Sequence, residues 1–141
     1  MAKQRFINTR FWNDNYISNL DPLEKLLFIY FLTNEHTNIC GFYELPLKVI
    51  AVETGIDSEM IQKMLPRLED RIRYIDGMVI VKNALKHQDN LSLQFKKGAL
   101  SMLLGVPREL LHKCLKNQWY IIPPTYPIDT VSIPPGDLDR D

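Results

Sequence analysis

The 141-residue chain has only two cysteines, Cys40 and Cys114, and they stand far apart. Two such cysteines imply no disulfide framework, so a reducing cytoplasm is the expected location. No apolar run approaches the ~18 residues of a membrane span, and the first residues carry no apolar stretch of the signal-peptide kind. The six glycines are scattered, so no glycine-rich loop is present to hold a phosphate.

The sequence also lacks an excess of charge of either sign, with 17 basic and 17 acidic side chains. A dedicated DNA-binding domain usually has a basic excess, so the balance argues against tight binding of duplex DNA. The charge is nevertheless uneven, because residues 91–117 hold five lysines and arginines against one glutamate. Any surface for a polyanion is therefore expected on the basic N-terminal arm and on these later residues.

Residues with enzymatic or metal-binding chemistry are sparse. His36 and Cys40 stand four apart in a predicted loop, and no second pair completes a tetrahedral zinc site. His112 and Cys114 are two apart on a predicted helix, so they point to different faces and make a poor nucleophile–base pair. The sequence therefore predicts no catalytic residue, no metal and no cofactor, and we expect a protein that is not an enzyme.

The segment "LDPLEKLLFIYFLTN" has the signals of a helix start. Asp21 suits the N-cap, Pro22 the first helical position and Glu24 the third position of a capping box. Apolar residues then cover most of the circumference up to Asn34, which predicts a helix packed on several sides.

The next segments predict a short strand followed by two helices. A β-like stretch lies at 40–45, Pro46 begins a helix, and Gly55 stands where a left-handed helix end is expected. Asp57 caps the following helix, whose apolar residues recur with a period of 3.6. Pro66 lies inside this pattern and predicts a kink or an early stop near Leu65.

Two β-rich runs flank the dipeptide Asp76-Gly77, which predicts a two-residue hairpin over residues 72–81. The predicted order of helix, short strand, helix, helix and hairpin is that of a winged helix-turn-helix. We therefore expect a mainly α fold with a small β-hairpin.

Two short helices and a proline-rich tail are predicted after the hairpin. The first helix has Leu93, Leu100, Leu103 and Leu104 on its apolar face, and the second buries Leu110, Leu111 and Leu115. Five prolines after Trp119 predict an extended or disordered tail. The predicted organisation is an aromatic and basic arm (1–20), a winged-helix domain (21–90), a helical extension (91–118) and the tail (119–141).

The second helix of the helix-turn-helix is the candidate reader of DNA. Glutamine can pair with adenine and lysine with guanine in the major groove, which makes Gln62 and Lys63 candidates. Asp57 and Glu59 suit the positive end of the helix dipole but repel phosphate. The alternative is a solvated face of mixed charge. The predicted DNA-binding residues are Gln62, Lys63, Arg67, Arg73, Lys82, Lys96 and Lys97.

Aromatic residues interleave with arginines in "RFINTRFWNDNYISNL". This composition suits the stacking of single-stranded bases, but it equally suits an arm that docks on the core or on a second subunit. Docking is favoured, because stacking platforms are usually sheets and grooves. The predicted partner or oligomer contacts in the arm and tail are Phe6, Phe11, Trp12, Tyr16, Tyr120 and Tyr126.

The chain resembles the N-terminal winged-helix domain of bacteriophage replication proteins, which are related to DnaD-type primosome and replisome-organiser proteins. The resemblance rests on "FWNDNYISNLDPLEKLLFIYFLTN" followed by "NICGFYEL", on "IAVETGIDSEMIQKMLPRLED", and on the hairpin with "VKNALKHQ". It covers roughly residues 5–90. It implies a role in starting phage or prophage DNA replication, either by binding DNA or by assembling host replication proteins, in the cytoplasm of the bacterial host.

Three functions follow as hypotheses. The first is a DNA-binding replication protein that acts on double- or single-stranded DNA. The second is an oligomerising or partner-binding scaffold of the same initiation complex, with copies of itself or host replication proteins as partners. The third is a small transcriptional regulator of a prophage. None of the three involves a membrane.

Overall fold

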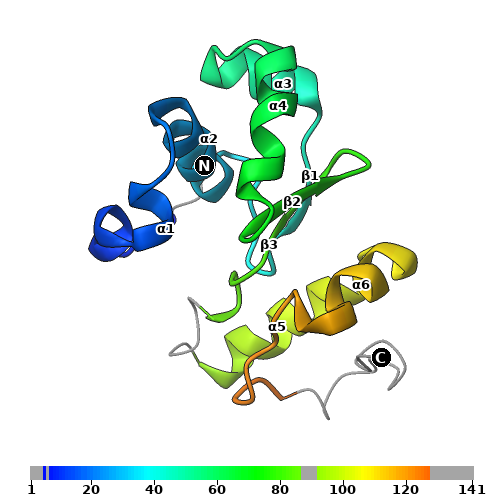
Figure 1. Cartoon of the computed structure of the whole chain (residues 1–141). Helices are drawn as coiled ribbons and strands as arrows, with labels where there is room; N and C mark the ends of the chain where they lie inside the picture. Colours follow the sequence, from blue (N-terminus) through cyan, green and yellow to red (C-terminus); the bar gives the residue numbers. More distant parts are fainter. Residues whose placement is uncertain (1–4, 6, 87–91, 128–141) are drawn as a thin grey trace. The chain divides into compact units, whose positions relative to one another are not determined.

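The structure is a computed structural model that describes residues 5, 7–86 and 92–127. The chain divides into two compact units (Figure 1). Unit 1 comprises residues 1–37 and 43–79, and unit 2 comprises residues 38–42 and 80–141.

The described residues form a mainly helical structure with a small antiparallel sheet, as the sequence predicts. The three strands are β1 (Phe42–Glu44), β2 (Ile72–Ile75) and β3 (Met78–Val81), in the order β1-β3-β2. The helices of unit 1 are η1 (Thr9–Asn13), α1 (Asn15–Ser18), α2 (Pro22–Thr33), α3 (Leu47–Thr54) and α4 (Ser58–Leu68). Those of unit 2 are α5 (Leu93–Leu104), α6 (Arg108–Leu115) and η3 (Lys116–Gln118).

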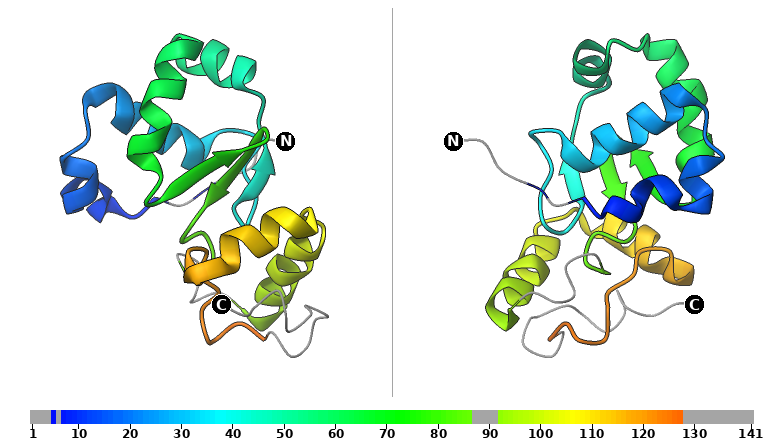
Figure 2. Two further views of the ribbon diagram at one scale, coloured as in Figure 1. Left: turned by 45° about the vertical axis from the view of Figure 1, so that its right-hand side comes forward. Right: turned by 90° about the vertical axis from the view of Figure 1, so that its left-hand side faces the viewer.

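Helix α2 begins and ends where its sequence predicts. The Glu24 carboxylate accepts a hydrogen bond of 2.8 Å from the Asp21 N–H, and Asn34 caps the C-terminal end. As predicted, α2 packs against more than one element, but it is not buried all round, because Leu23 and Leu26 remain 46% and 43% exposed. The packing explains this difference, since α3 and α4 cover only part of its circumference (Figure 2).

Helices α3 and α4 are joined through Gly55, whose φ of +78° is the predicted left-handed helix end. Asp57 then caps α4 by accepting a hydrogen bond from the Glu59 N–H. The predicted stop near Leu65 is not found, because α4 continues to Leu68 with Pro66 inside it. Pro66 lies in the last turn, where its missing N–H removes a single intrahelical bond and its fixed φ suits a helix.

The β2–β3 hairpin turns at the predicted dipeptide. Asp76 and Gly77 have φ values of +52° and +79°, and two positive φ values define the type I′ turn that matches strand twist. Strand β1 pairs with β3, and just beyond this pairing the Leu45 N–H donates to the Gly77 carbonyl at 2.8 Å.

Unit 2 is built on α5 and α6, which are joined by residues 105–107. Leu110, Leu111 and Leu115 are buried as predicted. On α5 the prediction is wrong for Leu93 and Leu104, which are exposed. The reason is that the buried face of α5 is centred on residues 96, 99, 100 and 103, so its first and last leucines lie at the edge of that face.

Residues 119–127 carry the described part of the tail, and they pack within unit 2. The Tyr120 hydroxyl donates to the Cys40 carbonyl at 2.5 Å, and the Tyr126 hydroxyl donates to the Leu85 carbonyl at 2.9 Å. Both tyrosines are buried, so the prediction that they contact a partner is wrong. The physical reason for their burial is that each ring buries apolar surface, while each hydroxyl donates a hydrogen bond to a carbonyl of unit 2. The rest of the predicted tail, residues 128–141, lies outside the described residues.

Candidate nucleic-acid interface

Helix α4 presents Gln62 and Lys63 to solvent, because its opposite face is buried. Ile61, Met64 and Leu68 recur at helical spacing and are each at most 5% exposed. Gln62 and Lys63 are both exposed, as the DNA-reading hypothesis requires of them. At the helix start, Asp57 and Glu59 are also exposed, so the outer face of α4 carries charges of both signs.

Arg67 extends the same helix but is held by an ion pair. Its Nε lies 2.8 Å from Oε2 of Glu24, whose side chain is 5% exposed against 54% for that of Arg67. The hydrogen bond and charge of Glu24 raise the pKa of Arg67. Part of the guanidinium is therefore committed to unit 1, and the remainder is open to solvent.

The N-terminal arm docks on unit 1 beside the end of α4. The Phe11 ring is buried, and its centre lies 5.8 Å from the centre of the Phe28 ring. The centre of the Tyr16 ring lies 6.0 Å from that of Phe28. Trp12 is 57% exposed and contacts the edge of Phe11, whereas Phe6 lies outside the described residues. Docking on the core is thus the observed role of Phe11 and Tyr16, and among the described aromatic residues of the arm Trp12 is the one that is exposed.

Asp14 and Arg71 complete this junction. The Arg71 guanidinium lies 4.6 Å from the centre of the Tyr16 ring, and its Nη1 is 3.4 Å from Oδ2 of Asp14. Partial burial alone would raise the pKa of Asp14, but the N–H groups of Tyr16 and Ile17 and the charge of Arg71 lower it. Arg71 is therefore engaged with the arm.

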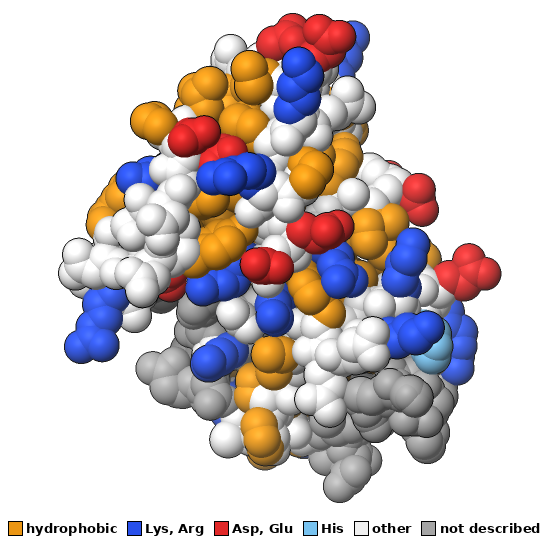
Figure 3. All heavy atoms as spheres, in the orientation of Figure 1, with side chains coloured by type: hydrophobic (Ala, Val, Ile, Leu, Met, Phe, Trp, Pro, Cys, Tyr) orange, Lys and Arg blue, Asp and Glu red, His pale blue; other side chains and the backbone are white. Residues whose placement is uncertain are grey.

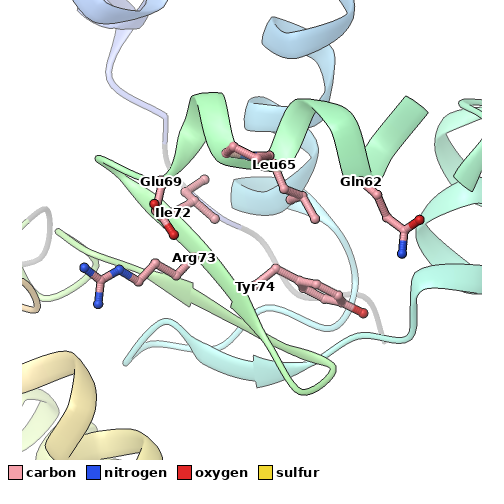
Figure 4. A pocket seen from close by; sticks show the side chains of 7 residues that line it. Gln62, Leu65, Glu69, Ile72, Arg73 and Tyr74 are labelled. Atoms are coloured by element: carbon pink, nitrogen blue, oxygen red, sulfur yellow. The ribbon is translucent and has the colours of Figure 1, made fainter. Parts of the chain in front are cut away.

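A hollow of about 260 Å³ lies between α4 and β2, and we call it the α4–β2 hollow. In Figure 4, Gln62 and Tyr74 point to one end, Glu69 and Arg73 lie at the other, and Leu65 and Ile72 stand between them. The Tyr74 hydroxyl donates to the Leu45 carbonyl at 2.6 Å, and burial raises the pKa of Tyr74. The lining residues are Gln62, Leu65, Pro66, Glu69, Ile72, Arg73 and Tyr74.

A second hollow, of about 460 Å³, lies on the opposite side of α4 against the start of α2, and we call it the α2–α4 groove. Its exposed apolar side chains include Leu23 and Met60. In Figure 3, apolar side chains are exposed over this part of unit 1 between charges of both signs. The lining residues are Asp21, Pro22, Leu23, Glu24, Met60, Lys63, Met64 and Arg67.

The predicted DNA-binding residues fall into both units. In unit 1, α4 carries Gln62, Lys63 and Arg67, and β2 carries Arg73. The other three predicted residues, Lys82, Lys96 and Lys97, belong to unit 2.

Those lysines differ in their surroundings. Lys97 is partly exposed, and the Nζ atom of Lys82 lies 5.9 Å from the centre of the Trp119 ring. Lys96 is 7% exposed, with Nζ 3.1 Å from Oγ1 of Thr125 and 5.2 Å from the Tyr126 ring. Because its ammonium group is used inside unit 2, the prediction of a surface contact through Lys96 is wrong.

Five lining residues of the α4–β2 hollow are not among the predicted site residues, and Glu69 and Tyr74 are the two of them with polar groups. In the sequence, Glu69 is typical of a surface charge at a helix end, and Tyr74 is typical of an aromatic residue in a strand. Only the packing of α4 against β2 brings them together. The one signal in the sequence is the short link between the helix and the hairpin, which keeps the two elements adjacent.

Cys40 and Cys114 are both buried, and burial raises the pKa of the Cys40 thiol to about 11. Within residues 5, 7–86 and 92–127, no three His, Cys, Asp or Glu side chains gather as ligands for a metal ion. In the same part of the chain, no helix has the length and apolar character needed to cross a membrane.

Comparison with known proteins finds no relative. No family model, no curated protein and no solved structure matches the chain. The proposed function therefore rests on the geometry of unit 1 and on the resemblance of the sequence to phage replication proteins.

Proposed function

We propose that the elements from α2 to β3 form a winged helix, in which α3 and α4 are the helix-turn-helix and the β2–β3 hairpin is the wing. The element order α2, β1, α3, α4, β2, β3 supports this assignment, as does the left-handed residue between the two helices. The wing is short, and its turn carries one charged residue, Asp76. An acidic wing tip disfavours phosphate, so α4 is the better candidate for the principal contact.

On this fold we propose a DNA-binding function for the outer face of α4. The observation that carries the proposal is the exposure of Gln62 and Lys63 on a helix whose opposite face is buried. Gln62 can make paired hydrogen bonds to a base edge, and Lys63 can bind either guanine or phosphate. Arg67 and Arg73 flank this face and supply further positive charge.

The number of cations around α4 sets the expected strength of binding. Lys63, Arg67 and Arg73 can neutralise about two to three phosphates, which corresponds to a slope of about −2 to −3 in a plot of log K against log salt. Asp57 and Glu59 oppose phosphate at the helix start. The proposed complex is therefore weak and moderately sensitive to salt.

The resemblance to phage replication proteins supplies the biological setting. We propose a non-enzymatic protein that acts in the initiation of phage or prophage DNA replication. DNA binding by unit 1 is then one contact of a larger initiation complex.

The test is fluorescence anisotropy of labelled double- and single-stranded DNA over a salt series. We expect binding that weakens with salt, and we expect Lys63→Ala to lower both the affinity and the slope. Lys48→Ala is the matched control, because Lys48 is an exposed lysine of α3 that lines neither hollow. Absence of binding to both forms at low salt contradicts the proposal.

The α2–α4 groove favours a second candidate, a partner-binding scaffold of the same initiation complex. Leu23 and Met60, which line the groove, are each more than 40% exposed, and such clustered apolar surface often marks a protein contact. Light scattering over a concentration series tests self-association through this groove. The scaffold function predicts that Leu23→Glu abolishes any oligomer, whereas a monomer at all concentrations excludes self-association.

A further inference from the structure

The α4–β2 hollow is a distinct feature beside the proposed DNA-binding face of α4. We infer that it binds one unpaired nucleobase of single-stranded DNA. The inference rests on the proposed function and makes it more specific, because it identifies the strand form and the part of the DNA that unit 1 recognises.

The size of the hollow limits its occupant. Its volume is about 260 Å³, whereas sites for drug-sized ligands and cofactors span roughly 300–1,000 Å³. A single flat ring system fits this space, and a complete dinucleotide or larger cofactor does not. The walls contributed by Leu65, Pro66 and Ile72 are apolar, as the faces of a base require.

The charges around the hollow favour a neutral occupant. Glu69 and Arg73 lie at the same end, so the site offers one negative and one positive side chain (Figure 4). A free phosphate would meet the Glu69 carboxylate, which makes it a poor ligand for the interior. A neutral base avoids this repulsion, and its attached phosphate can lie outside, within reach of the Arg73 guanidinium.

Tyr74 provides a preorganised surface for stacking. Its hydroxyl is fixed on the Leu45 carbonyl at 2.6 Å, and the ring is partly buried, so its orientation is set before a ligand arrives. Base stacking on an aromatic ring tolerates any sequence, because every base has a π-face. The ring therefore supplies affinity for bases in general.

Gln62 supplies the polar contact at the same end of the hollow as Tyr74 (Figure 4). Its amide has both a donor and an acceptor, which is the combination that pairs with adenine. Adenine is therefore the base that we expect to be preferred. In a duplex, both faces of a base are stacked and its pairing edge is occupied, so entry into the hollow requires an unpaired base.

The test compares single-stranded DNA, duplex DNA and a single strand with one abasic site, each labelled and measured by anisotropy. Unmodified strands carry one 2-aminopurine, whose fluorescence falls when the base stacks on an aromatic ring. The variants are Tyr74→Leu, which removes the π-face and keeps apolar bulk, and Gln62→Ala at an exposed position. Tyr74→Phe keeps the ring and loses only the hydroxyl anchor, and circular dichroism confirms the folding of each variant.

We expect the unmodified single strand to bind more tightly than the duplex, with quenching of 2-aminopurine. Tyr74→Leu should weaken single-strand binding about 5-fold or more, as the loss of one stacked base implies. It should leave duplex affinity unchanged, and Tyr74→Phe should retain most of the quenching. Gln62→Ala should remove the preference for adenine.

The outcomes distinguish this inference from the proposed function. Equal binding of single strands and duplex, unaffected by Tyr74→Leu, overturns the base site while leaving DNA binding by α4 intact. Absence of binding to all three DNAs overturns both. Unchanged 2-aminopurine fluorescence on binding of the single strand also overturns the base site.

Discussion

The hydroxyl of Tyr16 donates a hydrogen bond of 2.6 Å to the main-chain carbonyl of Arg67. Tyr16 belongs to the N-terminal arm, and Arg67 lies in the last turn of α4, where carbonyl groups have no partner within the helix. The arm therefore supplies a hydrogen-bond donor to a carbonyl at the end of α4, the helix that carries the proposed DNA-binding face. Arg71 stacks on the same ring and reinforces this junction.

Removal of this hydroxyl should destabilise unit 1 without unfolding it. Tyr16→Phe loses one hydrogen bond at a partly exposed site, which is worth about 1 kcal/mol of unfolding free energy. Tyr16→Ala should cost more, because it also removes the ring contacts with Phe28 and Arg71. Urea denaturation measures both variants. Equal stability of Tyr16→Phe and the wild type would show that the hydrogen bond contributes nothing.

Glu24 should be more important than an ordinary surface glutamate. One carboxylate oxygen accepts from the Asp21 N–H and the other pairs with Arg67. Glutamine retains the capping contact and loses the charge, whereas alanine loses both. Loss of the cap alone is expected to cost about 0.5–2 kcal/mol. Thermal unfolding should therefore rank Glu24→Ala below Glu24→Gln, with the exposed Glu35→Gln as the control. An identical melting temperature for all three variants contradicts the assigned role.

Two glycines with open surroundings provide a matched pair. A Cβ atom at Gly55 or at Gly98 meets nothing within 4 Å, so only the backbone conformation distinguishes them. Gly55 has φ of +78°, and Gly55→Ala should destabilise the chain by about 1 kcal/mol. Gly98 lies within α5, and Gly98→Ala should stabilise it by about 0.5–1 kcal/mol. Changes of the same sign in both variants would contradict the observed backbone.

Alkaline pH should destabilise the protein through Cys40. Burial raises the pKa of its thiol from 9.0 to about 11. Between these values the unfolded chain loses the proton and the folded chain keeps it, so the contribution of Cys40 is full below pH 9 and declines as pH rises toward 11. The decline attributable to Cys40 is on the order of 1–3 kcal/mol.

Denaturant unfolding at pH 8, 9, 10 and 11 measures this dependence. Tyrosines and lysines also titrate in this range, so the control is Cys40→Ala, which removes only the thiol. The variant should show a shallower decline than the wild type. Parallel curves for the two proteins would show that the thiol does not titrate as its burial implies.

Local signals in the sequence predicted where most elements begin and end. The capping roles of Asp21 and Asp57, the left-handed Gly55 and the Asp76-Gly77 turn are all found, because each depends on a few neighbouring residues. The early stop that Pro66 suggests is not found, since the effect of a proline depends on how close it lies to the end of the helix.

The burial of side chains is harder to predict, because it depends on which face of each helix is covered by another element of the fold. Leu26 and Lys96 show the two kinds of error. Leu26 belongs to an apolar helix and is exposed, whereas Lys96 is charged and is buried against Tyr126. The α4–β2 hollow could not be predicted for the same reason, because Gln62 and Tyr74 are separated in sequence and share a hollow only through the packing of α4 on β2.

We propose that α4 and the adjoining β2 strand form the DNA-binding surface of unit 1. The most direct measurement is a titration of isotope-labelled protein with a short adenine-containing single strand, followed by amide NMR shifts. If this proposal is right, the largest shifts cluster in residues 58–69 and 72–75. Shifts confined to α5 and α6, or no shifts at saturating DNA, would contradict it.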